Sequence, residues 1–324
     1  MSMTPEQASW FQDAAARIVA NVEQVLLGKT FVIRLAVAAM LSEGHLLLED
    51  VPGTGKTSLA RALAQSVHGT TTRIQFTPDL LPGDITGMSI WDQRTNTFEF
   101  HRGPVFGNIV LADEINRASP KTQSALLEAM EEAAVTVDGV SHRLADPFMV
   151  IATQNPIEQA GTYRLPEAQL DRFLMRTSVG YPDHVATVRI LEGSAMSPTR
   201  GAQLAGVVSA ATITEMAALA RTVHVDPIVA DYVARLVEAS RAASEVRLGV
   251  SVRGAMALMR AARVYAAMTG RHYVTPDDVK ALAEPVLAHR IVLEAEAEFD
   301  GVTASSVISQ VLVDTPPPVD RSGR

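Results

Sequence analysis

Short apolar runs of strand length recur along the first half of the chain, at residues 46–48, 73–76, 109–112, 149–153 and 175–179. Segments with helical periodicity precede or separate most of these runs, among them 4–27, 30–42 and 56–66. Strands that alternate with helices are typical of a mainly parallel sheet covered by helices on both faces. We therefore predict an α/β fold for this part of the chain.

The pattern changes after Tyr181-Pro182-Asp183, where helical segments follow one another at 214–222, 227–243, 253–269 and 276–287. The last of these begins well, because Thr275 can cap it, Pro276 suits its first turn, and the next two aspartates suit the positive end of the helix dipole. We place a boundary near residue 183, with an α/β domain at 1–183 and a small helical domain at 184–314. The proline-rich, polar tail at 315–324 is predicted to be disordered.

Composition narrows the protein classes further. A chain of 324 residues, 47% of them hydrophobic, suits two domains with sizeable cores. The absence of cysteine excludes disulfides, zinc fingers and thiol catalysis, and suits a cytosolic protein. A net charge of -8 argues against a broad basic surface for nucleic acid. The first residues carry Glu6 and Asp13 and no basic region before an apolar stretch, so no targeting segment is predicted. Charged residues interrupt the apolar segment 31–48, so no membrane span is predicted and we expect a soluble, cytoplasmic protein.

A glycine-rich loop stands between the first predicted strand and the helix at 56–66. It reads VPGTGKT, so the candidate phosphate-binding residues are Val51, Pro52, Gly53, Thr54, Gly55, Lys56, Thr57 and Ser58. Backbone N–H groups of such a loop cradle phosphates, the lysine reaches the β- and γ-phosphates, and the threonine hydroxyl binds Mg²⁺. Asp50 occupies the position where the strict pattern has glycine, which requires either unusual backbone angles at Asp50 or a slightly different turn. The flanking strand and helix favour an ATP site over a coincidental loop.

Two carboxylates, Asp113 and Glu114, follow the apolar run at 109–112. Ligands of open α/β sheets bind outside the carboxyl ends of the strands. Asp113 is therefore placed to hold Mg²⁺ through water, and Glu114 to polarise an attacking water molecule. A strand that ends in Asp-Glu can also be a helix cap, but after a phosphate loop at this spacing the catalytic interpretation is favoured.

Three further residues are candidates for contacts with the γ-phosphate. Asn155 follows another apolar strand and could bind the γ-phosphate or the attacking water, although a simple turn before Pro156 is the alternative. An arginine is the natural partner for charge that develops on a transferring phosphoryl group. Arg172 and Arg253 are both candidates, and the residues alone do not separate them from rivals such as Arg164 and Arg176.

Long strings of the sequence resemble the MoxR family of AAA+ ATPases over nearly the whole chain. They are LLLEDVPGTGKT (46–57), IQFTPDLLPGDITG (74–87), FHRGPVFGNIVLADEINRASPKTQSALLEAMEE (100–132), ATQNP (152–156), GTYRLPEAQLDRFLM (161–175) and VRGAMALMRAARVYAAMTGRHYVTPDDV (252–279). The resemblance implies a five-stranded AAA+ core followed by a helical lid. It also accounts for Asp50, because members of this family often carry aspartate there.

The resemblance implies roles for the remaining candidates. Asn155 matches the first sensor, Arg172 the arginine finger that reaches the neighbouring subunit's site, and Arg253 the second sensor. The residue before Arg253 is Val252, where the family often has proline, so the match is weaker there. The segment 85–104 matches the insert in the second helix, and 135–148 resembles the hairpin before the first sensor. Both excursions usually project toward the central pore or the client.

The function implied by the resemblance is a ring-forming, chaperone-like remodelling ATPase, predicted to be a hexamer, that uses ATP and Mg²⁺ to mature proteins or load metals or cofactors into them. No DxSxS motif occurs here, so the associated von Willebrand A domain is expected in a separate partner protein. One alternative is a nucleic-acid motor, which the acidic residues Asp138 and Asp146 in the second excursion disfavour. A nucleotide-gated binding module without essential turnover is another, and the intact Asp113 and Glu114 argue against it.

Overall fold

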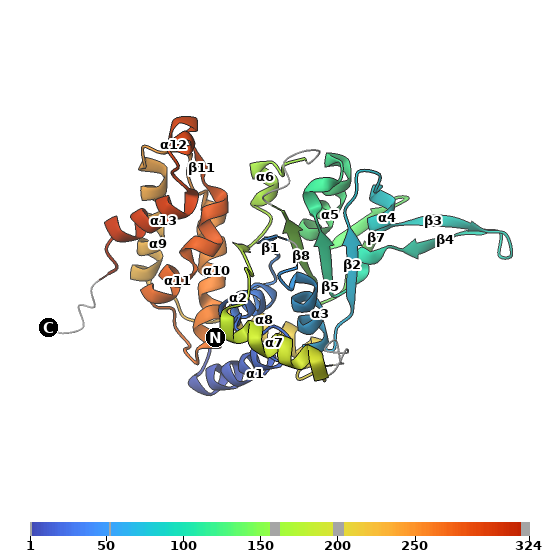
Figure 1. The fold of residues 1–324 in the computed structure, drawn as a ribbon, viewed down its shortest axis with the longest axis horizontal. Helices are drawn as coiled ribbons and strands as arrows, with labels where there is room; N and C mark the ends of the chain where they lie inside the picture. The colour runs from blue at the N-terminus through green and yellow to red at the C-terminus, as the bar shows by residue number, and fades with distance from the viewer. Residues whose placement is uncertain (1, 52, 156–162, 197–203, 319–324) are drawn as a thin grey trace. The chain divides into compact units, whose positions relative to one another are not determined.

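A computed structural model describes residues 2–51, 53–155, 163–196 and 204–318 (Figure 1). Its contacts divide the chain into two compact units. The core unit comprises Arg17–Phe173 and Thr177–Thr214, and the helical unit comprises Met1–Ala16, Leu174–Arg176 and Glu215–Arg324. This division does not fall at residue 183, because the segment Thr177–Thr214 makes most of its contacts with the core unit. The boundary near 183 therefore stays a prediction.

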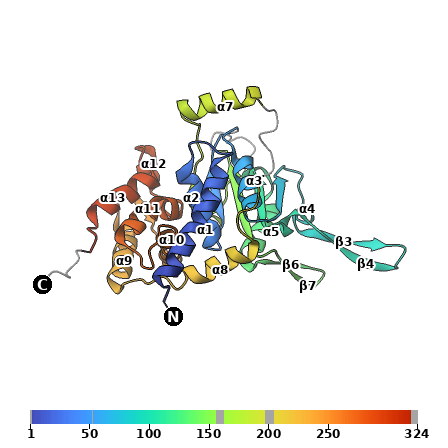
Figure 2. The same cartoon turned by 90° about the horizontal axis from the view of Figure 1, so that it is seen from below.

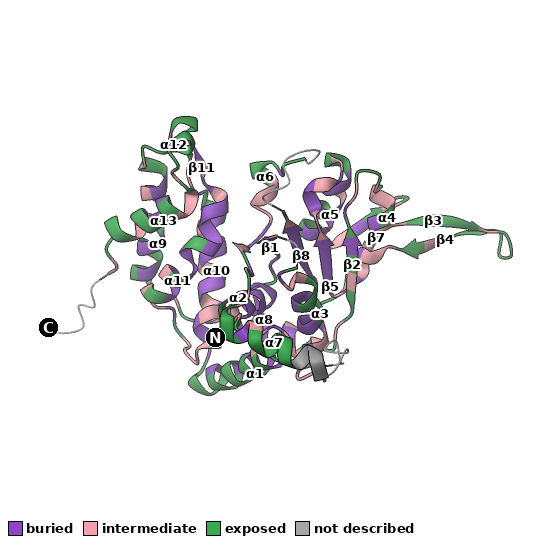
Figure 3. Ribbon diagram, in the orientation of Figure 1, coloured by how far each residue is buried: buried purple, intermediate pink, exposed green. Residues whose placement is uncertain are grey.

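The core unit is built on a five-stranded sheet with the order β2-β5-β8-β1-β9 (Figure 1). Its strands are β1 (Leu46–Glu49), β2 (Thr71–Gln75), β5 (Ile109–Asp113), β8 (Met149–Gln154) and β9 (Met175–Thr177). The pairs β1–β8, β2–β5 and β5–β8 are parallel. All five predicted strands are present. The inner strands β5 and β8 are buried almost throughout (Figure 3), as near-continuous apolar runs require in a sheet covered on both faces.

The helices of the core unit include α2 (Thr30–Leu41), α3 (Lys56–Ser66) and α5 (Pro120–Glu132), whereas α1 (Pro5–Glu23) begins in the helical unit and ends in the core unit. α2 is apolar around most of its circumference and largely buried, which explains its weak amphipathic pattern. Buried His45 joins α5 to the sheet, because its Nε2 lies 3.1 Å from the carbonyl oxygen of Met130 and its Nδ1 accepts from the Val150 amide. The ring can satisfy both contacts only as the neutral tautomer that carries its proton on Nε2.

The expected insert is a β-hairpin. After the short helix α4 (Pro82–Thr86), strands β3 (Gly87–Asp92) and β4 (Thr97–Arg102) pair antiparallel and extend away from the sheet (Figures 1 and 2). Gly87 has φ +91° at its base, and a Cβ there would lie 2.2 Å from the carbonyl oxygen of His101. Only glycine can therefore begin this hairpin without moving the opposite strand.

A second, shorter hairpin lies beside the first (Figure 2). It is formed by β6 (Ala134–Val137) and β7 (Val140–Arg143), within the segment expected to precede the first sensor. The rings of Phe100 on β4 and His142 on β7 stack with their centroids 4.2 Å apart. The two excursions therefore contact each other through a side-chain pair that the sequence did not indicate.

After the core strands the chain is mainly helical. The helices are α7 (His184–Met196), α8 (Ala210–Ala220), α9 (Pro227–Ala242), α10 (Val252–Met268), α11 (Pro276–Leu287), α12 (Ala295–Phe299) and α13 (Ala304–Asp314). A small antiparallel pair, β10 (Val246–Leu248) and β11 (Val292–Leu293), adds strands to a unit that was expected to be all helical. Within the described residues, no helix has both the length and the apolar character that crossing a bilayer requires.

The start of the predicted disordered tail is packed instead. Thr315 is buried, and the carbonyl oxygen of Pro316 accepts a hydrogen bond from Arg235 at 3.1 Å. Disorder is therefore a wrong expectation for these two residues, whereas 319–324 lie outside the described residues. The proline-rich, polar composition predicted a disordered tail, and nothing in it indicates the contact of Pro316 with Arg235 on α9.

Candidate nucleotide site

The glycine-rich loop connects β1 to α3 as predicted. Gly55 is the N-cap of α3 with φ 97° and ψ 14°, and no side chain caps the helix. The first N–H groups of α3 lie at the positive end of the helix dipole, and no side chain accepts a hydrogen bond from them. The positive φ favours glycine at this position, and a Cβ on Gly55 would also lie 2.8 Å from Leu26 Cδ1, so Leu26 would have to move. This uncapped helix start suits an anionic ligand such as a phosphate group.

The lysine and hydroxyl groups of the loop lie around this helix start. Lys56 Nζ donates to the carbonyl oxygens of Asp50, at 3.1 Å, and Val51, at 2.9 Å. Thr54 is buried, whereas Thr57 and Ser58 are exposed at the start of α3. Pro52 lies outside the described residues. The threonine hydroxyls and the lysine ammonium are the donor types that bind a Mg²⁺-nucleotide, so the loop's chemistry fits ATP.

Asp50 does not need the unusual backbone angles considered from the sequence. It is not among the residues with positive φ, and its amide continues the strand ladder by donating to the Gln154 carbonyl at 3.0 Å. The turn of the loop begins after Asp50, so aspartate is sterically acceptable at this position. Its side chain is buried, with 6% of the residue exposed.

A cavity of 400 Å³ adjoins the phosphate loop within the core unit. One part of its wall consists of loop and α3 residues, including Gly53, Gly55 and Thr57. The rest comes from segments that no motif indicated, and it is lined by Gln24, Val25, Leu26, Leu27, Lys29, Pro182 and Ile190. This second group is mostly apolar. A pocket with phosphate-binding groups at one side and apolar groups at the other matches the two chemical halves of a nucleotide.

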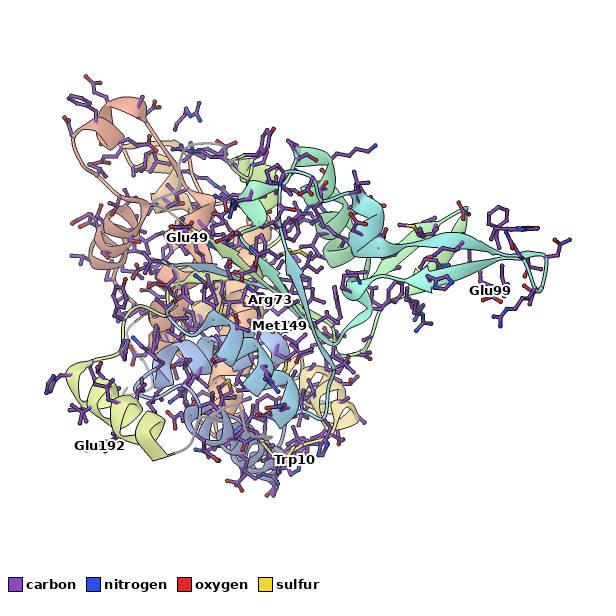
Figure 4. All side chains as sticks on the ribbon, turned by 45° about the vertical axis from the view of Figure 1, so that its right-hand side comes forward. Trp10, Glu49, Arg73, Glu99, Met149 and Glu192 are labelled. Atoms are coloured by element: carbon purple, nitrogen blue, oxygen red, sulfur yellow. The ribbon has the colours of Figure 1, made fainter. Side chains whose placement is uncertain are left out.

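Asp113 ends β5 beside the end of β8. Its Oδ1 accepts from Thr153 Oγ1 at 2.6 Å, and its Oδ2 lies 2.6 Å from Arg73 Nη2. Arg73 is on β2, the neighbouring strand, and is labelled in Figure 4. Hard carboxylate and hydroxyl oxygens are the ligands that Mg²⁺ prefers, so Asp113 and Thr57 fit this ion chemically.

Glu114 follows Asp113 with the left-handed backbone angles φ 56° and ψ 50°. Such angles are uncommon outside glycine and cluster at functional positions. The Glu114 amide donates to Thr153 Oγ1 at 2.8 Å, which supports this conformation. The Glu114 carboxylate accepts from Gln75 Nε2 and from Arg117 Nη1, each at 2.9 Å. Thr153, Gln75 and Arg117 therefore orient Glu114, and none of the three was identified from the sequence.

The other candidates lie in different places. Asn155 directly follows β8, at the sheet edge where β1 and β5 also end, and is buried. Arg172 contacts α5 instead, where its Nη1 lies 2.6 Å from both the Leu127 carbonyl and Glu131 Oε2. Arg253 is in the helical unit, in the first turn of α10, which Ser251 caps. The sheet therefore brings Asp113, Glu114 and Asn155 together with the loop, but not Arg172.

Comparisons with known proteins agree with this geometry. Residues 45–175 match the ATPase family associated with various cellular activities (AAA), and residues 238–311 match the AAA lid domain. The chain is 40% identical to "Chaperone MoxR1" of Mycobacterium tuberculosis, over 91% of this chain and 80% of that protein. It is 35% identical to "Protein MoxR" of Paracoccus denitrificans, over 89% and 90%. A crystal structure of a candidate ATPase from Cytophaga hutchinsonii superimposes with a TM-score of 0.90, at 36% identity over 97% of this chain and 98% of that one.

Proposed function

The chain belongs to the MoxR family of AAA+ ATPases, and from this premise we propose that it hydrolyses ATP in a ring and uses the energy to remodel client proteins. The observation that carries the proposal is the uncapped, glycine-bounded start of α3 beside the Asp113–Glu114 pair. The phosphate loop and the carboxylate pair lie on either side of the end of β8, because the Asp50 amide donates a hydrogen bond to the Gln154 carbonyl and the Glu114 amide donates one to Thr153 Oγ1. This arrangement supports phosphoryl chemistry.

ATP binds with its phosphates against the loop and its base in the apolar part of the cavity. The N–H groups at the start of α3 and the Lys56 ammonium hold the phosphates. Val25, Leu26 and Pro182 provide the apolar surface for the base. Thr57, and Asp113 through water, would hold Mg²⁺, which would supply positive charge to the phosphate oxygens.

Glu114 orients and deprotonates the attacking water, and Asn155 helps to hold that water near the γ-phosphate. The Glu114 carboxylate already accepts two hydrogen bonds, from Gln75 and Arg117. Both donors reach Oε2, so Oε1 is the carboxylate oxygen that neither of them occupies. We assign the attacking water to Oε1, while Gln75 and Arg117 hold the carboxylate in place.

Arg172 completes the site of the neighbouring subunit in a six-membered ring. In its own chain it is paired with Glu131 on α5, which is consistent with a residue that does not serve its own loop. A guanidinium at the γ-phosphate stabilises the charge of the transition state. Arg253 acts as the second sensor and links the helical lid to the nucleotide.

The β3–β4 hairpin contacts the client. Its exposed apolar residues are Met88, Ile90, Trp91 and Phe98, the last with 71% of its surface exposed. Figure 4 shows Glu99 on this hairpin, well away from Met149 in the sheet. Exposed apolar side chains on a projecting element suit transient binding of unfolded or partly folded chains. A von Willebrand A-domain protein is the proposed partner that delivers the client or its metal.

Mixed-ring ATPase measurements test this proposal. Lys56→Ala, Glu114→Gln and Arg172→Ala should each lower phosphate release by about 100-fold or more. Mixing the last two should restore activity, because a Glu114→Gln subunit offers its intact arginine to a neighbour with an intact glutamate. Arg164→Ala, the rival arginine, should stay near wild type. Size-exclusion chromatography should show that the mixed rings form. If they form and their ATPase activity is not restored, Arg172 does not act on the neighbouring subunit's site.

A client assay distinguishes remodelling from gated binding. Glu114→Gln with ATP should trap client and partner on the ring, which a pull-down followed by mass spectrometry would identify. A remodeller should then stall, so client maturation should stop although binding persists. Full client maturation by this variant would show that turnover is dispensable. Stimulation of the wild-type ATPase by DNA or RNA that weakens with salt would instead indicate a nucleic-acid motor.

A further inference from the structure

The aspartate at the start of the phosphate loop binds a distant part of the core unit. Asp50 Oδ2 accepts from the backbone amide of Val179 at 2.5 Å and from that of Gly180 at 3.0 Å. Hydrogen bonds from backbone N–H groups to an ionised carboxylate are about twice as strong as neutral ones. The Val179 amide belongs to a buried residue, so Asp50 satisfies a donor that water does not readily reach.

A second contact holds the same segment. Lys29 Nζ donates to the carbonyl oxygen of Tyr181 at 2.6 Å. Gly28 packs so closely that a Cβ there would lie 3.2 Å from Ala186 Cβ on α7. Asp183 then caps α7, because its Oδ1 accepts from the Ala186 amide at 2.7 Å. The segment from Val179 to the start of α7 is therefore fixed from the loop side and from the residues before α2.

This segment carries part of the cavity wall. Pro182 lies in it and Ile190 lies two turns into α7, and both line the cavity beside the phosphate loop. The carbonyl oxygen of Asp50 accepts from Lys56 Nζ, while its carboxylate holds the segment that precedes Pro182. Asp50 thus contacts both Lys56, the candidate phosphate-binding lysine, and the Val179–Gly180 backbone that precedes the apolar wall.

We propose that Asp50 is a positioning residue that fixes the base-binding wall of the cavity relative to the phosphate loop. The inference rests on the proposed binding of ATP at this loop. Without the Asp50 carboxylate, the Val179 and Gly180 amides lose their acceptor and the wall formed by Pro182 and Ile190 shifts. The phosphates keep their own donors on α3, so the loss falls on recognition of the base.

Comparing a ligand that has a base with one that consists of phosphates alone tests whether Asp50 affects recognition of the base and not of the phosphates. Titration calorimetry with ADP should show about 10-fold or greater weakening for Asp50→Ala, whereas inorganic tripolyphosphate should bind within about 2-fold of wild type. Asp50→Asn retains one acceptor oxygen without the charge, so its ADP affinity should lie between the two. Lys29→Met should change ADP binding in the same direction. Asp226→Ala removes another aspartate acceptor of a backbone amide, at the start of α9 in the helical unit, and should change the affinity for neither ligand.

Hydrolysis provides a second measurement on the same variants. Asp50→Asn should raise the KM for ATP while kcat stays within about 3-fold, because the catalytic groups are not displaced. Equal weakening of ADP and tripolyphosphate, or a fall in kcat at unchanged KM, would overturn the inference, and so would Asp50 variants that bind ADP like wild type. Wild-type protein that binds neither ligand would instead overturn the proposed ATP site.

Discussion

Asp278 lies in the first turn of α11 with only 2% of its surface exposed, and four donors surround its carboxylate. Arg271 Nη1 and Nη2 approach its two oxygens at 2.6 and 2.5 Å, and the Thr275 amide and hydroxyl both donate to Oδ2 at 2.8 Å. The hydrogen bond to Asp278 raises the pKa of Arg271 above its ordinary value. This pair joins the end of the turn after α10 to the start of α11.

Replacing Asp278 with alanine leaves the guanidinium and the Thr275 amide without their acceptor. Breaking a buried ion pair by removing one partner costs about 3–5 kcal/mol. Arg271 can regain some water, because 28% of its side chain is exposed, so we expect the low end of that range, about 3 kcal/mol. Arg271→Met together with Asp278→Leu should recover most of the loss, since no charge then stays buried and unpaired.

The neighbouring residue is a matched control. Asp277 is in the same helical turn with 89% of its side chain exposed, and its ion pair with Lys280 spans 3.6 Å. Asp277→Ala should therefore change the free energy of unfolding by no more than about 0.5 kcal/mol. Guanidinium denaturation followed by far-UV circular dichroism measures both variants. If Asp278→Ala were no more destabilising than Asp277→Ala, the buried pair would not stabilise this helix start.

Two further substitutions test the loop and the lid. Gly55→Ala should lower the melting temperature and weaken ADP binding by about 10-fold or more, because the residue has φ +97° and Leu26 lies 2.8 Å from the added carbon. Gly139→Ala, also at positive φ but in open space, should lower only the melting temperature. Tyr232→Phe should leave neutral-pH stability unchanged or higher, since the buried hydroxyl has no partner among the described residues. Burial raises the pKa of Tyr232, so the wild-type protein loses stability as the pH rises above 10. Thermal denaturation above pH 10 should therefore show a smaller loss of stability for Tyr232→Phe than for wild type.

The sheet was predictable because its strands are simple in sequence. Each inner strand is an apolar run buried on both faces, so the hydrophobic pattern alone locates it. Helix starts were equally clear where several local signals agree, as at Pro227 and Pro276. The β3–β4 hairpin was expected only as an insert, because the family resemblance located it. Its strands are mostly exposed, although Phe98 and Phe100 alternate with polar residues on β4 as they do in a typical strand.

Long-range pairings were beyond prediction. Asp50 and Val179, Phe100 and His142, and Arg172 and Glu131 are each far apart along the chain, and no local pattern links them. The apolar side of the cavity has the same difficulty, because Val25 and Pro182 are far from the loop along the chain and lie beside it only in the folded structure. A sequence motif records residues that act together at adjacent positions, so it identified the phosphate loop and missed the opposite wall.

One signal for the supporting residues was nevertheless present in the sequence. Thr153 directly follows the apolar residues of β8 and is 1% exposed, and its single hydroxyl contacts both Asp113 and the Glu114 amide. A polar group buried in an apolar strand costs free energy unless it is hydrogen-bonded, so its presence predicts a partner on a neighbouring strand. Because parallel strands end at the same edge of the sheet, that partner is expected near the ends of β1 and β5. The reasoning does not extend to Gln75, which is exposed at the end of the edge strand β2. Polar residues at the ends of buried strands therefore indicate which groups orient a catalytic side chain, even where no motif includes them.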